Sequence, residues 1–177
     1  MVLTHGHRDH LGAAGEPARR YGAEVAAHRL DAPVIRGEPP VPEPVPLDWE
    51  RPPYAHGLTV EPSPAPRVDR ETGDGVLPGS GDGARVVRSP GRTDGSIAVH
   101  PPRHGVLFTG DCAAGVGRVV PGVFRTDREP ALESFRRLAA PAPAAARPGH
   151  GDPLTDGTAA ALRASADRDS GLQIEHG

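Results

Sequence analysis

The chain has 177 residues, the length of a single domain, and its 36% hydrophobic and 3% aromatic residues predict a small core. The net charge is only −3 and the 20 basic residues, all arginines, form no dense cluster, which argues against nucleic acid as a main partner. No apolar run approaches the roughly 20 residues of a membrane-spanning helix, and Cys112 has no second cysteine for an internal disulfide.

The most distinctive segment follows an expected strand end at residues 1–4. It reads Thr-His-Gly-His-Arg-Asp-His and places His5, His7, Asp9 and His10 within six residues. Neutral imidazole and carboxylate groups suit zinc, and also iron or manganese. Without a cation, burying these groups together would leave costly unsatisfied polar atoms. The segment therefore predicts a metal site, with a solvated polar loop as the alternative.

The rest of the first half predicts few regular elements. Residues 11–21 predict a helix that Gly22 ends, and residues 24–27 predict a short strand. Residues 38–68 carry ten of the 22 prolines, so we expect neither a helix nor a central strand there. We interpret this stretch as a surface excursion over the active site, anchored by Trp49 and Tyr54. A loop without function is the alternative.

The second half alternates strands and helices. Expected strands cover residues 84–88, 96–100, 105–109 and 144–147; expected helices cover residues 126–140, capped by Thr126 or Asp127, and 156–166. This layout predicts an α/β or α+β domain over residues 1–166 and a frayed C-terminal tail over residues 167–177.

Three later motifs accompany the histidine segment. They are the Pro-Gly-Arg-Thr-Asp-Gly-Ser loop of residues 90–96, the apolar strand that ends in Gly110-Asp111, and Pro-Gly-His-Gly-Asp around His150. In this order the four motifs resemble the metallo-β-lactamase-fold hydrolases, in particular the glyoxalase II-like branch. The resemblance runs from about Met1 to Ala166.

The resemblance implies an αββα sandwich with a metal site at the strand ends. It implies that His5 and His7 bind a first metal, that Asp9, His10 and His150 bind a second, and that Asp111 bridges the two. The implied cofactor is zinc, one or two ions, with iron or manganese as alternatives. The implied reaction is hydrolysis of a small-molecule ester, thioester, lactone or lactam by a metal-bound hydroxide, and Asp9 would orient this nucleophile or accept a proton.

Arg92 departs from the family pattern. The family loop carries a histidine at this position as the third ligand of the first metal, whereas guanidinium offers only donors. Three interpretations remain open. The enzyme works with one metal, and Arg92 pairs with Asp111 as a substitute for the missing cation. The domain is catalytically degenerate and binds metal or ligand without turnover. A single-base change produced the arginine.

The position of the histidine segment is the second departure. Family members carry several strands before it, whereas here it begins at residue 5, so we expect the sandwich to lack the first strands of its N-terminal sheet. We interpret the chain as a fragment, a misplaced start or a decayed gene, and expect poor solubility from the open sheet edge. The expected location is cytoplasmic, with no membrane or nucleic-acid partner, and the oligomeric state is left open.

The remaining histidines match no ligand of the family. We expect His28, His56, His100 and His104 to be surface residues or hydrogen-bonded core residues. Cys112 follows Asp111 directly; a zinc ligand is one interpretation, and a small buried apolar residue is the one we favour.

Overall fold

The computed structural model describes residues 1–61 and 63–172, and its strands form two sheets. The larger sheet has six strands: β3 (Gly75–Val76), β4 (Arg85–Arg88), β5 (Ile97–His100), β6 (Val106–Gly115), β7 (Val119–Pro121) and β8 (Ala145–Gly151). Neighbouring strands from β3 to β7 are antiparallel, while β8 runs parallel to β6. The expected strands at residues 84–88 and 96–100 are thereby confirmed to within one residue.

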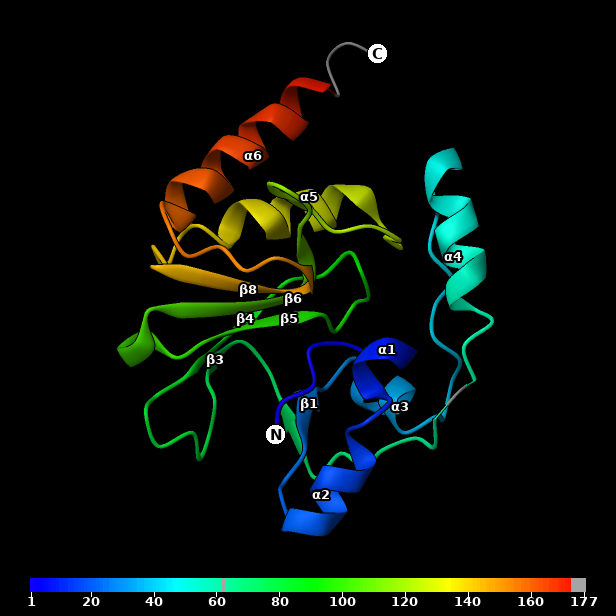
Figure 1. Ribbon diagram of the computed structural model, residues 1–177. Helices are drawn as coiled ribbons and strands as arrows, with labels where there is room; N and C mark the ends of the chain where they lie inside the picture. Colours follow the sequence, from blue (N-terminus) through cyan, green and yellow to red (C-terminus); the bar gives the residue numbers. More distant parts are fainter. Residues whose placement is uncertain (62, 173–177) are drawn as a thin grey trace.

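The N-terminal part builds the smaller sheet. Its strands β1 (Ala26–His28) and β2 (Arg70–Thr72) pair in parallel, and Val2 forms one further bridge with Ala26. Three short helices, α1 (Arg8–Leu11), α2 (Gly15–Tyr21) and α3 (Ala32–Ile35), lie around it (Figure 1). The helix expected over residues 11–21 is therefore broken between α1 and α2, although Gly22 ends it as predicted, in the left-handed conformation.

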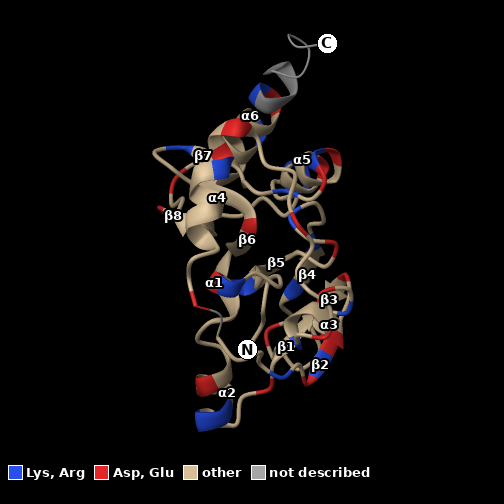
Figure 2. Cartoon of the chain, turned by 90° about the vertical axis from the view of Figure 1, so that its right-hand side faces the viewer, with Lys and Arg blue, Asp and Glu red and all other residues tan. Residues whose placement is uncertain are grey.

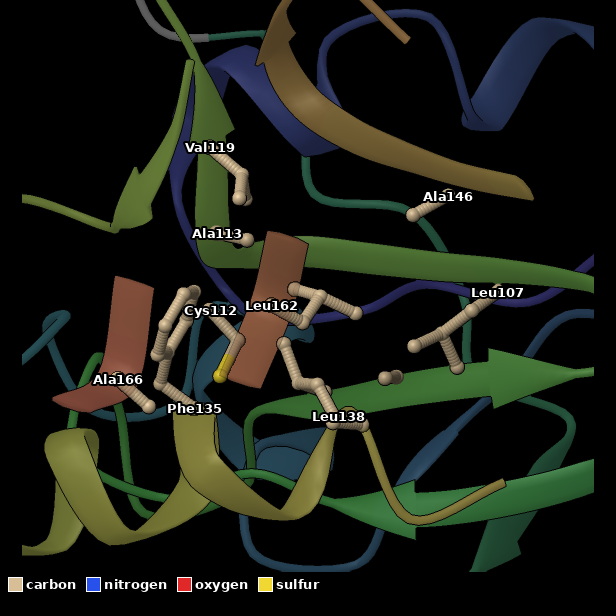
Figure 3. Packing of buried hydrophobic residues seen from close by; sticks show 11 residues of the cluster. Leu107, Cys112, Ala113, Val119, Phe135, Leu138, Ala146, Leu162 and Ala166 are labelled. Carbon is tan, nitrogen blue, oxygen red and sulfur yellow. The ribbon is translucent and has the colours of Figure 1, made fainter. Parts of the chain in front are cut away.

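Two longer helices, α5 (Arg128–Arg137) and α6 (Thr158–Leu172), cover the opposite face of the larger sheet (Figure 1). Apolar side chains from both helices meet those of β6; among them are Phe135, Leu138 and Leu162, which are wholly buried (Figure 3). The Asp127 side chain accepts a hydrogen bond from Glu129 N and caps α5, one of the two caps that the sequence predicted. Helix α6 continues past Ala166, so the tail expected from residue 167 is helical to Leu172, and residues 173–177 lie outside the described residues.

The elements stack as helices, larger sheet, smaller sheet and helices, the layering expected of an αββα sandwich (Figure 1). Acidic and basic residues are interspersed along the chain rather than separated by sign (Figure 2). None of the helices in residues 1–61 and 63–172 combines the length and apolarity needed to cross a membrane.

The proline-rich excursion differs from the expectation. It contains a 3₁₀ turn, η1 (Asp48–Glu50), and a helix, α4 (Arg51–Gly57), where we expected neither. The two adjacent prolines lie in the first turn of α4, where an amide hydrogen has no helical acceptor, so they start the helix instead of breaking it. Trp49 is 63% exposed and is no anchor, whereas the ring of Tyr54 lies 5.4 Å from that of Phe124.

Strand β6 is longer than its expected bounds, residues 105–109, because it continues through Asp111 to Gly115. Its pairing with β8 shifts register around Gly110, which has a φ of 50°. A Cβ at Gly110 would lie 2.8 Å from the Thr4 side chain, so glycine allows the histidine loop to pack against this irregularity. Asp111 therefore leaves a kinked strand and not a strand end.

Candidate metal centre

The histidine loop is anchored to the larger sheet. Ile97 N of β5 donates to Thr4 O at 2.9 Å, and Thr4 Oγ1 lies 3.2 Å from His5 Nδ1. Because the other ring nitrogen of His5 points toward Asp111, this contact orients the imidazole for the site. One turn of α1 then carries Asp9 and His10 onto the same side.

Asp111 lies at the centre of the site and is 8% exposed. Its Oδ1 is 3.0 Å from His10 Nε2 and 3.5 Å from His150 Nε2. Its Oδ2 is 3.0 Å from Arg92 Nη2 and 3.6 Å from His5 Nε2. The two carboxylate oxygens thus face two different groups of side chains.

The group around Oδ1 fits a metal ion. Ligand atoms of Asp9, His10, Asp111 and His150 all lie within 4.8 Å of one another. Two of these atoms, His10 Nε2 and Asp111 Oδ1, are buried without a properly aligned hydrogen bond, which is costly unless a cation uses them. A Cβ at Gly149 would collide with Asp111 Oδ1 and His10 Cε1, so glycine keeps this space open. Two imidazoles and two carboxylates are a suitable donor set for zinc, iron or manganese.

The group around Oδ2 holds a guanidinium. Arg92 is 5% exposed, and its Nη1 donates to Val123 O at 2.7 Å and to Phe124 O at 2.9 Å. Its Nη2 makes the ion pair with Asp111, so the pair suggested by the sequence is present. Within residues 1–61 and 63–172, His5 Nε2 and His7 Nδ1 beside it have no hydrogen-bond partner. The positions expected to hold a first metal thus contain two histidines and a permanent positive charge.

The charges in the site follow from burial and from Asp111. Burial raises the pKa of Asp111, but His10, His5 and Arg92 outweigh that effect and hold it well below the usual range. Burial lowers the pKa of His5 far below its ordinary value, and burial with the nearby Arg92 lowers that of His7 to about 4. Burial also lowers the pKa of His10, but the carboxylates of Asp111 and Asp9 outweigh it and raise the net value. Near neutral pH, Asp111 is a carboxylate and His5 and His7 are neutral.

Asp31 joins the two loops behind the site, and the sequence analysis missed it. Its Oδ2 accepts from Gly6 N at 2.9 Å and from Thr93 Oγ1 at 2.7 Å, and its Oδ1 accepts from Gly95 N at 2.9 Å. The histidine loop and the Arg92 loop are thereby held in register by one buried carboxylate. The only sequence signal, an aspartate before α3, indicates a helix cap, a hydrogen bond that this side chain does not make.

The other histidines and Cys112 lie outside this cluster. His100 is buried with Nδ1 2.9 Å from Val106 O, and His56 and His104 are exposed, as expected. His28 is buried, and its Nδ1 accepts a hydrogen bond from Leu30 N, as expected of a core histidine. Its Nε2 has no hydrogen-bond partner in the described part of the chain, so the expectation holds for one ring nitrogen only. Burial raises the pKa of Cys112 to about 12, and its side chain packs among Phe135 and its neighbours (Figure 3), which supports the apolar interpretation.

The chain belongs to the metallo-beta-lactamase superfamily, whose family model matches residues 1–150. The family resemblance seen in the motifs is thereby confirmed. The superfamily is one of hydrolases that bind metal ions, and residues capable of binding a metal gather in this chain.

Two curated relatives illustrate the relationship. The probable metallo-hydrolase YflN of Bacillus subtilis is 30% identical in an alignment 177 positions long, which covers 88% of this chain and 65% of that protein. A hydroxyacylglutathione hydrolase of Cereibacter sphaeroides is 32% identical over 144 residues, which cover 79% of this chain and 43% of that protein. The chain therefore spans less than two thirds of the length of these relatives.

Two solved structures share the fold. The metallo-beta-lactamase family protein TTHA1429 from Thermus thermophilus has a TM-score of 0.65 at 27% identity, over 98% of this chain and 60% of its own. TTHA1623, solved in a di-iron-bound form, has a TM-score of 0.60 at 28% identity, over 87% of this chain and 70% of its own. These similarities agree with the layered fold described above.

Proposed function

We propose that the protein is a hydrolase of esters, thioesters, lactones or lactams that works with one metal ion, held by Asp9, His10, Asp111 and His150. The proposal rests on the two carboxylate oxygens of Asp111, which face different partners. Oδ1 faces the two histidines of the metal group, while Oδ2 is paired with Arg92. In this arrangement the guanidinium neutralises the side of the carboxylate that a second cation would otherwise occupy.

Each residue of the group has a distinct task. His10 and Asp111 are the more buried members and would fix the ion, whereas Asp9 and His150 are exposed and border the solvent side. Asp9 Oδ2 lies 3.0 Å from His150 Nε2, so the two side chains already converge there. From that position the Asp9 carboxylate would orient the attacking water or accept its proton.

Zinc is the ion we propose, with iron and manganese as alternatives that the same ligands would accept. A bound divalent cation would lower the pKa of a water from about 15.7 to about 7 and polarise the substrate carbonyl. We also propose a cytoplasmic location, where a free thiol such as that of Cys112 stays reduced.

Thioesters are the first substrates to test, since hydroxyacylglutathione hydrolases are among the relatives. The zinc-loaded chain should hydrolyse a hydroxyacyl thioester, a lactone or a β-lactam faster than the metal-stripped chain. The rate should be lost in His10→Ala and largely kept in His5→Ala, because only His10 belongs to the metal group. Equal rates with and without zinc on all three substrates would refute the proposal.

The second candidate is a catalytically degenerate domain that binds metal or ligand without turnover. The buried guanidinium beside His5 and His7 favours it, because that position lacks its third ligand. Restoring a histidine at position 92 separates the two candidate functions. If the wild-type chain is inactive and Arg92→His hydrolyses the same substrates, the scaffold is a degenerate hydrolase. If the wild-type chain is active with one ion, the first candidate stands.

A further inference from the structure

We propose that Phe124 and Tyr54 clamp Arg92 as a fixed positive charge in the first metal position, so that the chain admits one ion and excludes a second. The inference rests on the one-ion site proposed above and adds the residues that maintain it. Neither Phe124 nor Tyr54 belongs to the metal-ligand motifs. The evidence comes from the backbone of Phe124, from its ring, and from the segments that hold its loop.

The backbone of Phe124 is bent in an unusual way. Its φ is 54°, in the left-handed region that bulky residues rarely adopt. This turn directs two successive carbonyl groups, those of Val123 and Phe124, onto Nη1 of Arg92. A strained residue that persists in a structure is held by its surroundings. Here the strained backbone places two carbonyl acceptors on the guanidinium of Arg92.

The ring of Phe124 covers the same guanidinium. Arg92 Cζ lies 5.2 Å from the ring centroid, within the about 6 Å range of a cation–π contact. On the ring, Tyr54 of α4 adds a tilted aromatic contact at 5.4 Å. The excursion of residues 38–68 thus reaches the metal centre through Tyr54, Phe124 and Arg92 in turn.

Hydrogen bonds tie the loop of Phe124 to its neighbouring segments. Gly91 O, next to Arg92, accepts from Thr126 N at 2.8 Å, which ties the loop to the Arg92 turn. Val45 N donates to Arg125 O at 2.8 Å, which ties the loop to the excursion. On the preceding side, Gly122 N donates to Cys112 O at 3.1 Å, so the backbone that carries the two carbonyls is held beside Arg92.

The clamp explains how a second ion is kept out. A cation between His5, His7 and Asp111 would need Oδ2, which lies 3.0 Å from Nη2 of Arg92. To free that oxygen, the guanidinium would have to leave a buried place where two carbonyl oxygens accept its hydrogens and Asp111 compensates its charge. Its positive charge would also repel an arriving cation at short range.

The test is the number of zinc ions retained after loading and desalting, measured by native mass spectrometry. The wild-type chain should hold one ion, and Arg92→Ala should hold two, because His5, His7 and Oδ2 are then free. Phe124→Ala should also admit a second ion, more weakly than Arg92→Ala, since the guanidinium loses its cover. The matched control, Phe124→Tyr, keeps the ring and should hold one ion. If Phe124→Ala does not melt cooperatively, Phe124→Leu and Tyr54→Ala replace it.

The outcomes distinguish the clamp from the hydrolase. A wild-type chain that holds two ions or none overturns the inference. So does a second ion in Arg92→Ala but not in folded Phe124 and Tyr54 variants, because Arg92 would then need no clamp. One ion in the wild type with the expected second ion in the variants supports the inference even if no substrate is hydrolysed, a result that would count against the proposed function alone.

Discussion

The guanidinium of Arg92 lies 3.0 Å from Oδ2 of Asp111, and both side chains are almost fully buried. Each charge compensates the other in an environment with little water. A buried pair of this kind contributes little beyond what two apolar residues would, but losing one partner leaves the other charge uncompensated. The pair therefore constrains which residues can be changed in the metal-free protein.

Asp111→Asn should destabilise the metal-free chain by about 3–5 kcal/mol, because Arg92 would keep its buried charge without a counter-ion. The measurement is the free energy of unfolding from denaturant titration. Asp152→Asn, which removes an exposed carboxylate near the end of β8, should change it by less than about 0.5 kcal/mol. Equal effects of the two substitutions would contradict the buried-pair argument.

Zinc retention should depend on Asp9 and not on His5. Asp9→Ala removes one of the four proposed ligands, so zinc affinity should fall by more than the about 10- to 100-fold that loss of an outer partner causes. His5→Ala changes a residue that faces Oδ2, the oxygen paired with Arg92, and the ion should stay. Titration calorimetry on metal-stripped protein measures both. Loss of the ion in His5→Ala would show that the two groups act as one site.

The sequence pointed to the residues of the candidate metal group because they lie in short, recognisable motifs. The histidine segment holds three histidines and an aspartate within six residues, and Asp111 and His150 were assigned through motifs that resemble those of the family. Asp31 and Phe124 carry no such pattern. The role of Asp31 depends on two loops that meet only in the folded chain. The role of Phe124 depends on a positive φ angle, which a phenylalanine in the sequence does not predict.

The proline-rich excursion shows a different limit. Ten prolines made a helix improbable by average propensity, yet the position of each proline decides the outcome. Pro52 and Pro53 fall in the first turn of α4, where proline is compatible with a helix. The proline count alone does not give these positions. It also does not show that Trp49 is exposed to solvent while Tyr54 packs on Phe124.

Gly149→Ala should abolish tight zinc binding while the chain still folds. The new methyl group would occupy the space against Asp111 Oδ1 and His10 Cε1, the side of the carboxylate that faces the metal group. Gly15→Ala is the matched control, because a Cβ there meets no atom within 4 Å and α2 tolerates alanine. Retained ions counted by mass spectrometry, with circular dichroism to confirm folding, give the answer. A Gly149→Ala chain that still holds its ion would mean that the ligands converge elsewhere.

Asp31→Asn should loosen both loops of the site. The two oxygens of Asp31 accept from Gly6 N, Thr93 Oγ1 and Gly95 N, so an amide nitrogen in place of either oxygen would face at least one donor. Leaving a buried donor unpaired costs about 1–3 kcal/mol, and the unfolding free energy should fall by that amount. Zinc affinity should fall about 10- to 100-fold as well, because the loop that Gly6 anchors leads directly into α1, which carries Asp9 and His10. Asp94→Asn, an exposed change in the Arg92 loop, should leave both quantities unchanged. If zinc affinity survives in Asp31→Asn while stability falls, the carboxylate supports the fold and not the alignment of the metal ligands.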